Sequence, residues 1–341
     1  MAVGLPEDSL PISAQRLDIM KQMEPFAEEK LVLLKAPDKC WQPTDFLPDS
    51  TSENWHDEVK ALRKTSESLS DELLVVLIGD MITEEALPSY QTLLTATDGF
   101  LEGLGTHMSP WGQWARGWTA EENRHGDLLN RYLYLTGRVN MRSVEETVQF
   151  LIRNGFDPQV SRDPYKLFIY TSFQERATKI SHGNVGRIAE KEGDSMLAKI
   201  STTIAADEAK HESAYKLFFG ECLKHDPDGA MIAFREMLEG KIAMPSLYME
   251  DGKTENLYDV FSVVAQRLNV YTAMDYADIT RHLVEFWDIP NISGLSSKGR
   301  DAQEYVCNLA PRYARIAERT QNRIVSKGTP VSFPWIFGRT A

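Results

Sequence analysis

Two short motifs place a glutamate three residues before a histidine inside an otherwise apolar helical stretch. Glu208 and His211 lie in TTIAADEAKHESAY, and Glu122 and His125 lie in WTAEENRHGDLL. At helical spacing, both polar residues of each motif share a face with hydrophobic residues placed three and four positions away. Burying a carboxylate and an imidazole is costly unless each is paired, hydrogen-bonded or bound to a metal. A shared metal centre would explain both motifs.

Two more glutamates extend this pattern. Glu84 precedes Glu122, and Glu175 precedes Glu208, by a distance that suits one helix, a turn and a returning helix. Two Glu-x-x-His helices, together with one glutamate from each of two other helices, form the donor set of a carboxylate-bridged di-metal site. Such donors suit iron or manganese in a redox role. Periodicity alone does not decide whether Glu84 or Glu85 faces inward.

Each motif taken alone has an ordinary structural explanation. Among seven histidines, about one is expected to follow a glutamate at this spacing by chance. Thr119 and Glu122 could form a helix-capping box, and Glu208 could form a surface pair with Lys210 or Lys224. Finding both motifs in order on apolar helices favours the metal centre.

The other five histidines lack a partner motif, so we expect them to be surface or core groups. Among them, His182 lies seven residues after Glu175, on the same helical face.

The elements that must position these residues are predicted to be helical. Residues 1–50 are expected to form an arm, with a helix from Ser13 to Leu34 before a proline-rich segment. Residues 51–341 are expected to form a single helical domain. Its bundle core spans about residues 68–224, and further helices follow it.

The first helices of this domain have recognisable boundaries. A short helix is predicted from Ser52 to Arg63, and a capping box at Ser68 and Asp71 should begin a long helix that runs to about Thr97. Pro88 should kink the long helix about one turn after Glu84.

Three later helices complete the predicted bundle. They are expected at about 111–134, 164–189 and up to Lys224, with a long crossover between the first two. The fold class is therefore all-α. Residues 227–327 are predicted to form further helices, and Val331–Phe337 a short edge pairing.

Composition limits the environment and the partners. The chain has 341 residues, of which 42% are hydrophobic and 26% charged, as in a soluble globular protein. A net charge of −13 disfavours binding to nucleic acid or to an anionic membrane. Three widely spaced cysteines predict no disulfide framework. The first ten residues lack a secretory or transit signal, so we expect a cytosolic protein or a mature form whose targeting segment has been removed.

Four segments carry a family resemblance: GDMITEEALP, WTAEENRHGDLL, YTSFQERAT and IAADEAKHESAY. They closely resemble the soluble plant acyl-[acyl-carrier-protein] desaturases, the stearoyl-ACP desaturase family, and the resemblance extends from about residue 10 to WIF at 335–337. It implies a homodimeric, ferritin-like bundle that binds two iron ions. The ligands that it implies are Glu84, Glu122, His125, Glu175, Glu208 and His211.

The resemblance also implies functional residues around the irons. Thr178 corresponds to a hydroxyl beside the oxygen-binding face, and Trp41 and Asp207 correspond to residues proposed to carry electrons inward from the surface. The implied reaction belongs to fatty acid biosynthesis and uses O2 and two electrons from reduced ferredoxin. It inserts a cis double bond into a saturated acyl chain on acyl carrier protein. The implied location is the plastid, in the chloroplast stroma.

An acidic enzyme needs a local basic surface to bind acyl carrier protein, which is itself acidic. Basic residues recur at spacings of three and four near the C-terminus, which predicts a basic stripe on one helix. The members are Arg312, Arg315, Arg319, Arg323 and Lys327. The alternative is a solvated helix face with intrahelical pairs, for instance through Glu318.

Several positions depart from the family pattern for forming the bond at carbon nine. Leu167 replaces a glycine, Ala96 and Val160 replace threonines, and Thr97 replaces a leucine. The acyl channel implied by the resemblance is lined by Leu93, Ala96, Thr97, Pro158, Val160, Leu167 and Phe168. A leucine in place of glycine removes room for several methylenes. We therefore predict either a stearoyl substrate or, because of Leu167, a palmitoyl substrate with a shifted bond position.

Two other classes of protein fit parts of the pattern. A ferritin-like iron-storage or ferroxidase protein would share the ligands and the fold, but it would need neither an acyl channel nor a docking stripe. A helical binding module would contain the same polar residues as satisfied core groups. Bound iron would exclude the binding module, and turnover on acyl-ACP would exclude iron storage.

Overall fold

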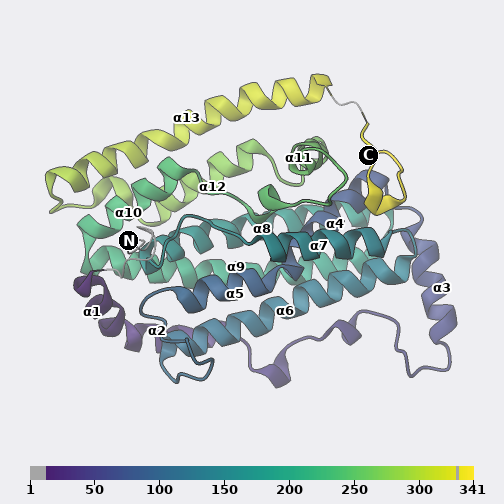
Figure 1. The fold of residues 1–341 in the computed structure, drawn as a ribbon, viewed down its shortest axis with the longest axis horizontal. Coiled ribbons are helices and arrows are strands. Elements are labelled where there is room, and N and C mark those ends of the chain that lie inside the picture. Colours follow the sequence, from purple (N-terminus) through teal and green to yellow (C-terminus); the bar gives the residue numbers. More distant parts are fainter. Residues whose placement is uncertain (1–12, 328–329) are drawn as a thin grey trace, which may run out of the picture.

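Four helices form the centre of an all-α, ferritin-like fold, as predicted. The computed structural model describes residues 13–327 and 330–341, and it describes the side chains of the last helix up to residue 319. In Figure 1 the long helices run along the longest axis of the molecule. The four core helices are α4 (Asp71–Glu85), α6 (Pro110–Thr136), α8 (Pro164–Glu192) and α9 (Ser195–His225). The closest packing is between α8 and α9.

Each core helix begins at a side-chain cap. Ser109, Asp163 and Asp194 accept backbone N–H bonds in the first turns of α6, α8 and α9, which satisfies donors that the helix itself cannot pair. The cap of α4 is Ser70, which accepts from Leu73 N. The predicted capping box at Ser68 was therefore wrong. Ser68 instead donates its hydroxyl to the carbonyl of Thr65 in the preceding helix.

The two predicted apolar stripes are buried in the core. Trp111, Trp114 and Trp118 of α6 are almost fully buried, and so are Ile204 and Tyr215 of α9. Both Glu-x-x-His motifs continue these stripes, so folding carries their polar groups into the bundle.

The predicted long helix carrying Glu84 is broken rather than kinked. Helix α4 ends at Glu85, Ala86 lies between the two helices, and α5 (Leu87–Ala96) begins with a proline in its first turn. Pro88 has no N–H to continue the hydrogen-bonding pattern. The hydroxyl of Tyr90 donates to the carbonyl of Thr83 at 2.8 Å. Glu84 therefore lies in the last turn of its helix.

The arm and the crossover contain more helices than the sequence predicted. The expected helix Ser13–Leu34 divides at Met23 into α1 (Ala14–Gln22) and α2 (Glu24–Lys30), because Pro25 stands in the first turn of α2. Short 3₁₀ turns and α3 (Trp55–Ser66) lead to the bundle. The crossover between α6 and α8 contains α7 (Met141–Asn154), which begins at the Asn140 cap.

The remaining helices cover one side of the bundle. In Figure 1, α13 lies along one edge of the molecule, with α10, α11 and α12 between it and the core. Their bounds are α10 (Pro227–Gly240), α11 (Leu257–Arg267), α12 (Ala273–Phe286) and α13 (Ser297–Lys327). The expected pairing near the C-terminus consists of a single antiparallel bridge between Ser332 and Thr340.

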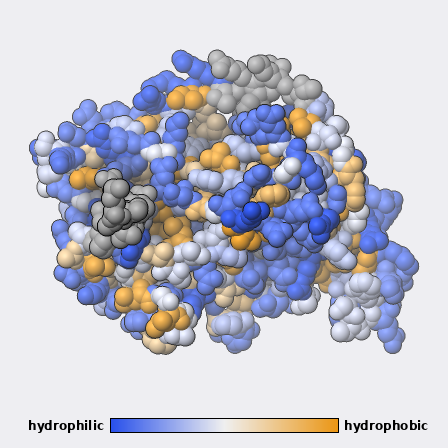
Figure 2. Space-filling view, in the orientation of Figure 1, coloured by the Kyte–Doolittle hydropathy of each residue, from blue (hydrophilic) through white to orange (hydrophobic). Residues whose placement is uncertain are grey.

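The face of the molecule drawn in Figure 2 is mainly hydrophilic. On the face drawn in Figure 2, hydrophobic residues occur as small, separate patches. None of the helices that the structure describes combines the length and apolar character needed to cross a membrane.

Candidate metal centre and its cavity

Six side chains from the four core helices converge in two overlapping groups. One group is Glu84, Glu122, His125 and Glu208, and the other is Glu122, Glu175, Glu208 and His211. Within each group, one ligand atom per residue lies within 4.8 Å of all the others. Glu122 and Glu208 belong to both groups. The arrangement therefore fits two adjacent metal ions that share two carboxylates and have one terminal glutamate and one histidine each.

Both histidines direct Nδ1 toward the shared carboxylates. His125 Nδ1 lies 3.4 Å from Glu122 Oε2 and 3.6 Å from Glu208 Oε1. His211 Nδ1 lies 2.7 Å from Glu122 Oε1 and 3.4 Å from Glu208 Oε2. The two imidazoles therefore approach the same central space from opposite helices.

The donor atoms fit a bound cation. Among the described residues, Nδ1 of both histidines, Glu122 Oε1 and Glu208 Oε2 are buried and form no hydrogen bond. Four buried carboxylates around this space would be strongly unfavourable without positive charge between them. Carboxylate and imidazole donors suit iron or manganese.

Burial and mutual repulsion perturb the carboxyl groups. Burial is the main cause that raises the pKa of Glu84 to about 7, and the neighbouring charges of Glu208 and Glu122 add to it. Burial likewise raises the pKa of Glu175. Burial would also raise the pKa of Glu208, but His125 and His211 outweigh it and lower that pKa. Perturbed carboxyl groups of this kind are typical of functional sites.

The structure decides between Glu84 and Glu85. Glu84 is 7% exposed and belongs to the cluster, whereas Glu85 is half-buried outside it. The two terminal glutamates have different hydrogen-bond partners. Glu84 Oε1 lies 2.9 Å from His182 Nε2, and Glu175 Oε1 accepts from Trp118 Nε1 at 2.9 Å.

A second layer of carboxylates lies behind the histidines. His125 Nε2 faces Asp207 Oδ2 at 3.7 Å, and His211 Nε2 faces Glu121 Oε2 at 3.1 Å. Such outer partners fix the ring orientation of a metal-binding histidine. Glu121 was not identified from the sequence. A signal was present, because an acidic residue precedes the motif glutamate in both EENRH and DEAKH.

Trp41 joins this layer to the surface. Its indole N–H donates to Asp207 Oδ2 at 2.8 Å, and its ring stacks on His125 with centroids 5.9 Å apart. The guanidinium of Arg124 lies 4.3 Å from the Trp41 ring. Lys35 Nζ also donates to Asp207 at 2.8 Å, and Lys35 N donates to Glu121 Oε1 at 2.6 Å. Sequence reasoning missed both Arg124, which lies inside the first Glu-x-x-His motif, and Lys35, which comes from the N-terminal segment.

A cavity of about 570 Å³ begins at the cluster. Its wall includes Thr178 and the carboxylates of Glu84, Glu122, Glu175 and Glu208. The hydroxyl of Thr178 donates to the carbonyl of Glu175 at 3.1 Å, one turn earlier in α8. The cavity continues outward between α8, α11 and α13 to the exposed side chains of Leu247 and Ile316.

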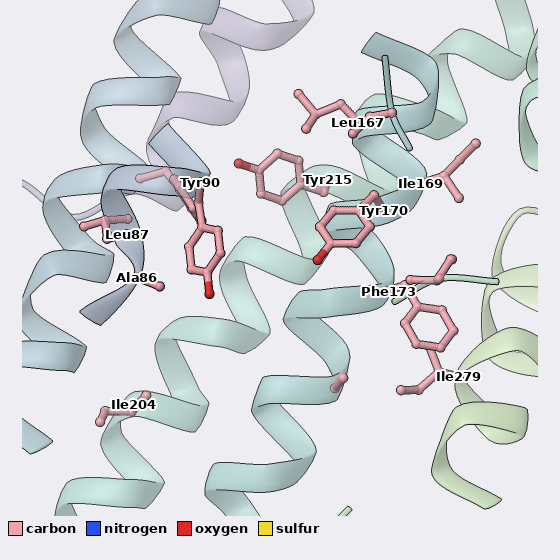
Figure 3. Packing of buried hydrophobic residues seen from close by; sticks show 14 of the residues in the cluster. Ala86, Leu87, Tyr90, Leu167, Ile169, Tyr170, Phe173, Ile204, Tyr215 and Ile279 are labelled. Carbon is pink, nitrogen blue, oxygen red and sulfur yellow. The ribbon is translucent and has the colours of Figure 1, made fainter. Parts of the chain in front are cut away.

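Aromatic rings form part of the cavity wall. Tyr90 and Tyr248 line it, and Phe156 packs edge-on against both at centroid distances of 5.5 and 5.3 Å. Figure 3 shows Tyr90 from α5 beside Tyr215 from α9 and Tyr170 from α8, with Leu167 further along α8.

None of the seven predicted channel residues borders this cavity. Leu167, Phe168 and Val160 are fully buried, and Phe168 packs on Trp111 at 5.5 Å. Pro158 and Thr97 are also buried, Leu93 is half-buried, and Ala96 is exposed.

The predicted basic stripe lies on α13. Arg312, Arg315 and Arg319 are exposed, on the same helix whose residues Ile316 and Ala317 line the cavity. None of these three arginines has an ion-pair partner among the described side chains, so pairing through Glu318 is not observed. The side chains of Arg323 and Lys327 lie outside the described residues.

The simpler explanations of the two motifs do not hold. Thr119 lies inside α6, where its hydroxyl donates to the carbonyl of Ala115, so it does not cap the helix. Glu208 is 1% exposed and therefore forms no surface pair.

Residues 15–337 match the family model described as fatty acid desaturase. The chloroplastic stearoyl-[acyl-carrier-protein] 9-desaturase of Olea europaea is 53% identical over 329 residues, covering 96% of this chain and 84% of that relative. The chloroplastic stearoyl-[acyl-carrier-protein] 9-desaturase 1 of Arabidopsis thaliana is 53% identical over 326 residues, covering 95% and 82% respectively.

A solved structure shares the fold. The X-ray structure of DesA2 from Mycobacterium tuberculosis, described as an acyl-ACP desaturase, aligns with a TM-score of 0.54 and 18% sequence identity. The alignment covers 84% of this chain and 99% of that one.

Proposed function

The chain belongs to the fatty acid desaturase family, and we propose that it desaturates a saturated acyl chain carried on acyl carrier protein. The reaction consumes one O2, two electrons and two protons. It removes two hydrogens from neighbouring carbons, and it yields a cis double bond and two waters. The observation that carries this proposal is the cavity whose inner wall contains all four carboxylates of the cluster and whose outer end reaches the surface.

We assign the six clustered residues as ligands of two iron ions. Glu122 and Glu208 would bridge the pair, Glu84 and His125 would complete one position, and the remaining two residues of the set would complete the other. When bound, the irons would supply the reduction of O2 and the removal of hydrogen from the acyl chain. The protein would hold one carbon–carbon bond beside them and exclude bulk water.

Thr178 is placed to serve the oxygen side of the reaction. It lies on the cavity wall one turn after Glu175. Among the residues that the structure describes, its hydroxyl bonds only to carbonyls of its own helix. A small rotation of this side chain would turn Oγ1 toward the cavity. We assign it the role of holding or passing a proton beside the centre.

Electrons would enter on the side opposite the cavity. Trp41 is half-buried and connects the surface with His125 through stacking and through Asp207. Lys35 and Lys210 lie near Asp207 with partly exposed side chains. A positively charged rim around an aromatic entry point suits an acidic electron donor. Reduced ferredoxin is the donor that we propose.

Acyl carrier protein would dock beside α13. The exposed arginines of this helix stand next to the outer end of the cavity, in a chain whose overall charge is −13. Local positive charge can orient an acidic carrier despite the unfavourable net charge. The attached acyl group would then enter the cavity between α11 and α13.

The aromatic part of the cavity wall suggests a limit on acyl length. Tyr90 lines the cavity and packs against Phe156, and Leu167 is fully buried in the core. The relatives named above act on stearoyl-ACP at position nine. We infer either the same substrate, admitted by movement of these rings, or palmitoyl-ACP with a shifted bond position.

Location and assembly are further parts of the proposal. The relatives are chloroplastic proteins, which supports a plastid location for this chain. The homodimer implied by the sequence resemblance stays a prediction. Light scattering on the purified protein would test it.

Turnover of defined substrates tests the proposal. Iron-loaded protein would be incubated with O2, reduced ferredoxin and either stearoyl-ACP or palmitoyl-ACP, and the products would be located by mass spectrometry. We expect a single cis double bond in at least one substrate. Oxidation of added Fe²⁺ without any change in the acyl chain would instead support the iron-storage or ferroxidase function.

A further inference from the structure

The two halves of the candidate metal centre are not equally supported. Each terminal glutamate lies 2.9 Å from a ring nitrogen, but the partner residues differ. Glu84 has the imidazole of His182, and Glu175 has the indole of Trp118. The shared glutamates obey the twofold pattern, and this pair of contacts is one place where the symmetry breaks.

His182 is held for this contact by its own surroundings. It lies in the middle of α8 and is 1% exposed. Its Nδ1 lies 4.0 Å from Asp80 Oδ2, and Asp80 in turn accepts from Ser181 Oγ at 2.9 Å. Asp80 also lines the cavity. His182 can donate from Nε2 to Glu84 in its charged form, which has a proton on both ring nitrogens, and in the neutral tautomer that is protonated on Nε2.

Glu84 needs such support more than Glu175 does. Glu84 lies one residue before the end of α4, where the chain breaks at Ala86. Glu175 lies well inside α8, with helical turns on both sides. A carboxylate in the last turn of a helix has a less constrained backbone, so a side-chain donor is the main restraint on its orientation.

We propose that His182 is a positioning residue that holds Glu84 in the orientation needed to bind one of the two metal ions, and that Trp118 does the same for Glu175. This inference rests on the assignment of the cluster as a di-metal centre. It predicts that removing one of these two outer residues weakens metal binding at one position and leaves metal binding at the other position unchanged.

Metal binding by three variants tests the inference. Metal-free protein would be titrated with Co²⁺, and bound ions would be counted and then located in crystals by anomalous diffraction. His182→Leu removes the donor, His182→Gln retains an N–H at similar reach, and Trp118→Phe removes the matching donor on the other side. Circular dichroism of each metal-free variant would establish that it folds.

We expect His182→Leu to bind one ion as the unchanged protein does, beside Glu175 and His211, and to bind the second about 10–100-fold more weakly. His182→Gln should restore the second ion to within a few-fold of normal affinity. In Trp118→Phe the weakened ion should be the one beside Glu175. If His182→Leu does not fold, the affinity for the ion beside Glu84 is compared in His182→Gln and Asp80→Asn instead. Asp80→Asn removes the carboxylate behind the ring and should weaken this ion, and an unchanged affinity would overturn the inference.

Two results would overturn the inference. One is full binding of both ions by His182→Leu, and the other is equal weakening of both ions without rescue by glutamine. A wild-type protein that binds no Co²⁺ or Fe²⁺ would instead contradict the metal centre itself. Failure of the inference and failure of the metal-centre assignment therefore give different results.

Discussion

At the scale of single residues, the six clustered side chains are not equivalent, because two of them belong to both metal positions. Glu122 and Glu208 each face both histidines, whereas Glu175 and Glu84 each belong to one group. Replacing a shared carboxylate should therefore have a larger effect than replacing a terminal one. This difference can be measured as the number of metal ions that each variant binds.

We expect Glu208→Gln to lose both ions and Glu175→Gln to lose one. Glutamine keeps the size of the side chain but removes the charge that a metal ion requires. Iron analysis after gel filtration would measure the number of ions per chain, with circular dichroism as the control for folding. Retention of two ions by Glu208→Gln would contradict the assignment of this residue as a bridge.

The sequence predicted the clustered residues more completely than the contacts behind them. Glu-x-x-His places two donors on one helix face, so spacing alone brings Glu208 and His211 together. The partners behind them come from other elements. Glu121 faces the histidine of a different helix, and the contact of His182 with Glu84 depends on how α4 and α8 pack. No local spacing encodes these contacts.

At the scale of elements, the close approach of α6 to the end of α4 determines where Glu84 meets His125. Gly126 makes this approach possible, because a Cβ there would lie 3.2 Å from the backbone carbon of Glu84 and the nitrogen of Glu85. A side chain at this position would have to push the two helices apart by a few tenths of an ångström.

Gly126→Ala should therefore weaken metal binding, by about tenfold on the scale of outer-shell changes. The substitution raises helix propensity by about 1 kcal/mol, so the fold itself need not suffer. Gly183→Ala in α8 is the matched control, since a Cβ there meets no atom within 4 Å. Isothermal titration would measure the Co²⁺ affinity of both variants. Equal affinities in the two variants would contradict the role of Gly126.

A second element-scale feature is a charged cluster that joins α8, α9 and α12. Glu212 accepts from Arg176, Lys179 and Lys216 at 2.6–2.8 Å, and Lys216 Nζ lies 3.0 Å from His282 Nε2. Burial and the neighbouring positive charges of Arg176 and Lys216 lower the pKa of His282 to about 4. The imidazole is therefore neutral in the folded protein near pH 7.

Folding stability should depend on pH through His282. The pKa of His282 in the folded protein lies below that of an unfolded histidine, about 6.5. The full contribution of the neutral imidazole to folding stability is therefore present above pH 6.5. This contribution is lost as the pH falls from about 6.5 toward 4. We expect a loss of about 1–2 kcal/mol after allowing for solvent screening. Urea unfolding between pH 7.5 and 4.5 should give a flatter profile for His282→Gln, and parallel profiles would contradict the prediction.

The boundaries of α6 were predicted well, because a local cap and a glycine define them. The predicted helix 111–134 corresponds to α6 at Pro110–Thr136, which begins at the Ser109 cap and ends at Gly137 with φ of 69°. The breaks at Met23 and Ala86 were missed. In both cases a proline one or two residues later ends the preceding helix, whereas apolar periodicity continues across the break and suggests one helix.

At the scale of the whole molecule, the proposed function depends on a cavity that connects the buried cluster to the surface. No sequence pattern predicted its course, because its walls come from α4, α8, α11, α13 and the segment 240–248. The seven predicted channel residues do not line this cavity. The likeness to the family indicated a channel, but only the packing of this chain determines where it ends.

The docking surface belongs to this scale as well. Charge reversal at Arg315 and Arg319 should raise the KM for acyl-ACP about tenfold with little change in kcat, because exposed charges act mainly on association. A control with Lys60→Glu and Arg142→Glu changes the net charge equally on α3 and α7, where both side chains are exposed. Steady-state kinetics at low salt would compare the variants. Equal KM values in the two double variants would contradict docking on α13.

The most direct test of the central claim is a single turnover by iron-loaded protein with acyl-ACP, reduced ferredoxin and O2. Mass spectrometry would give the number of double bonds formed for each pair of irons, in the wild-type protein and in Glu208→Gln. The account predicts one cis double bond per iron pair in the wild type and none in the variant. Iron oxidation with an unchanged acyl chain, or equal product from both proteins, would contradict it.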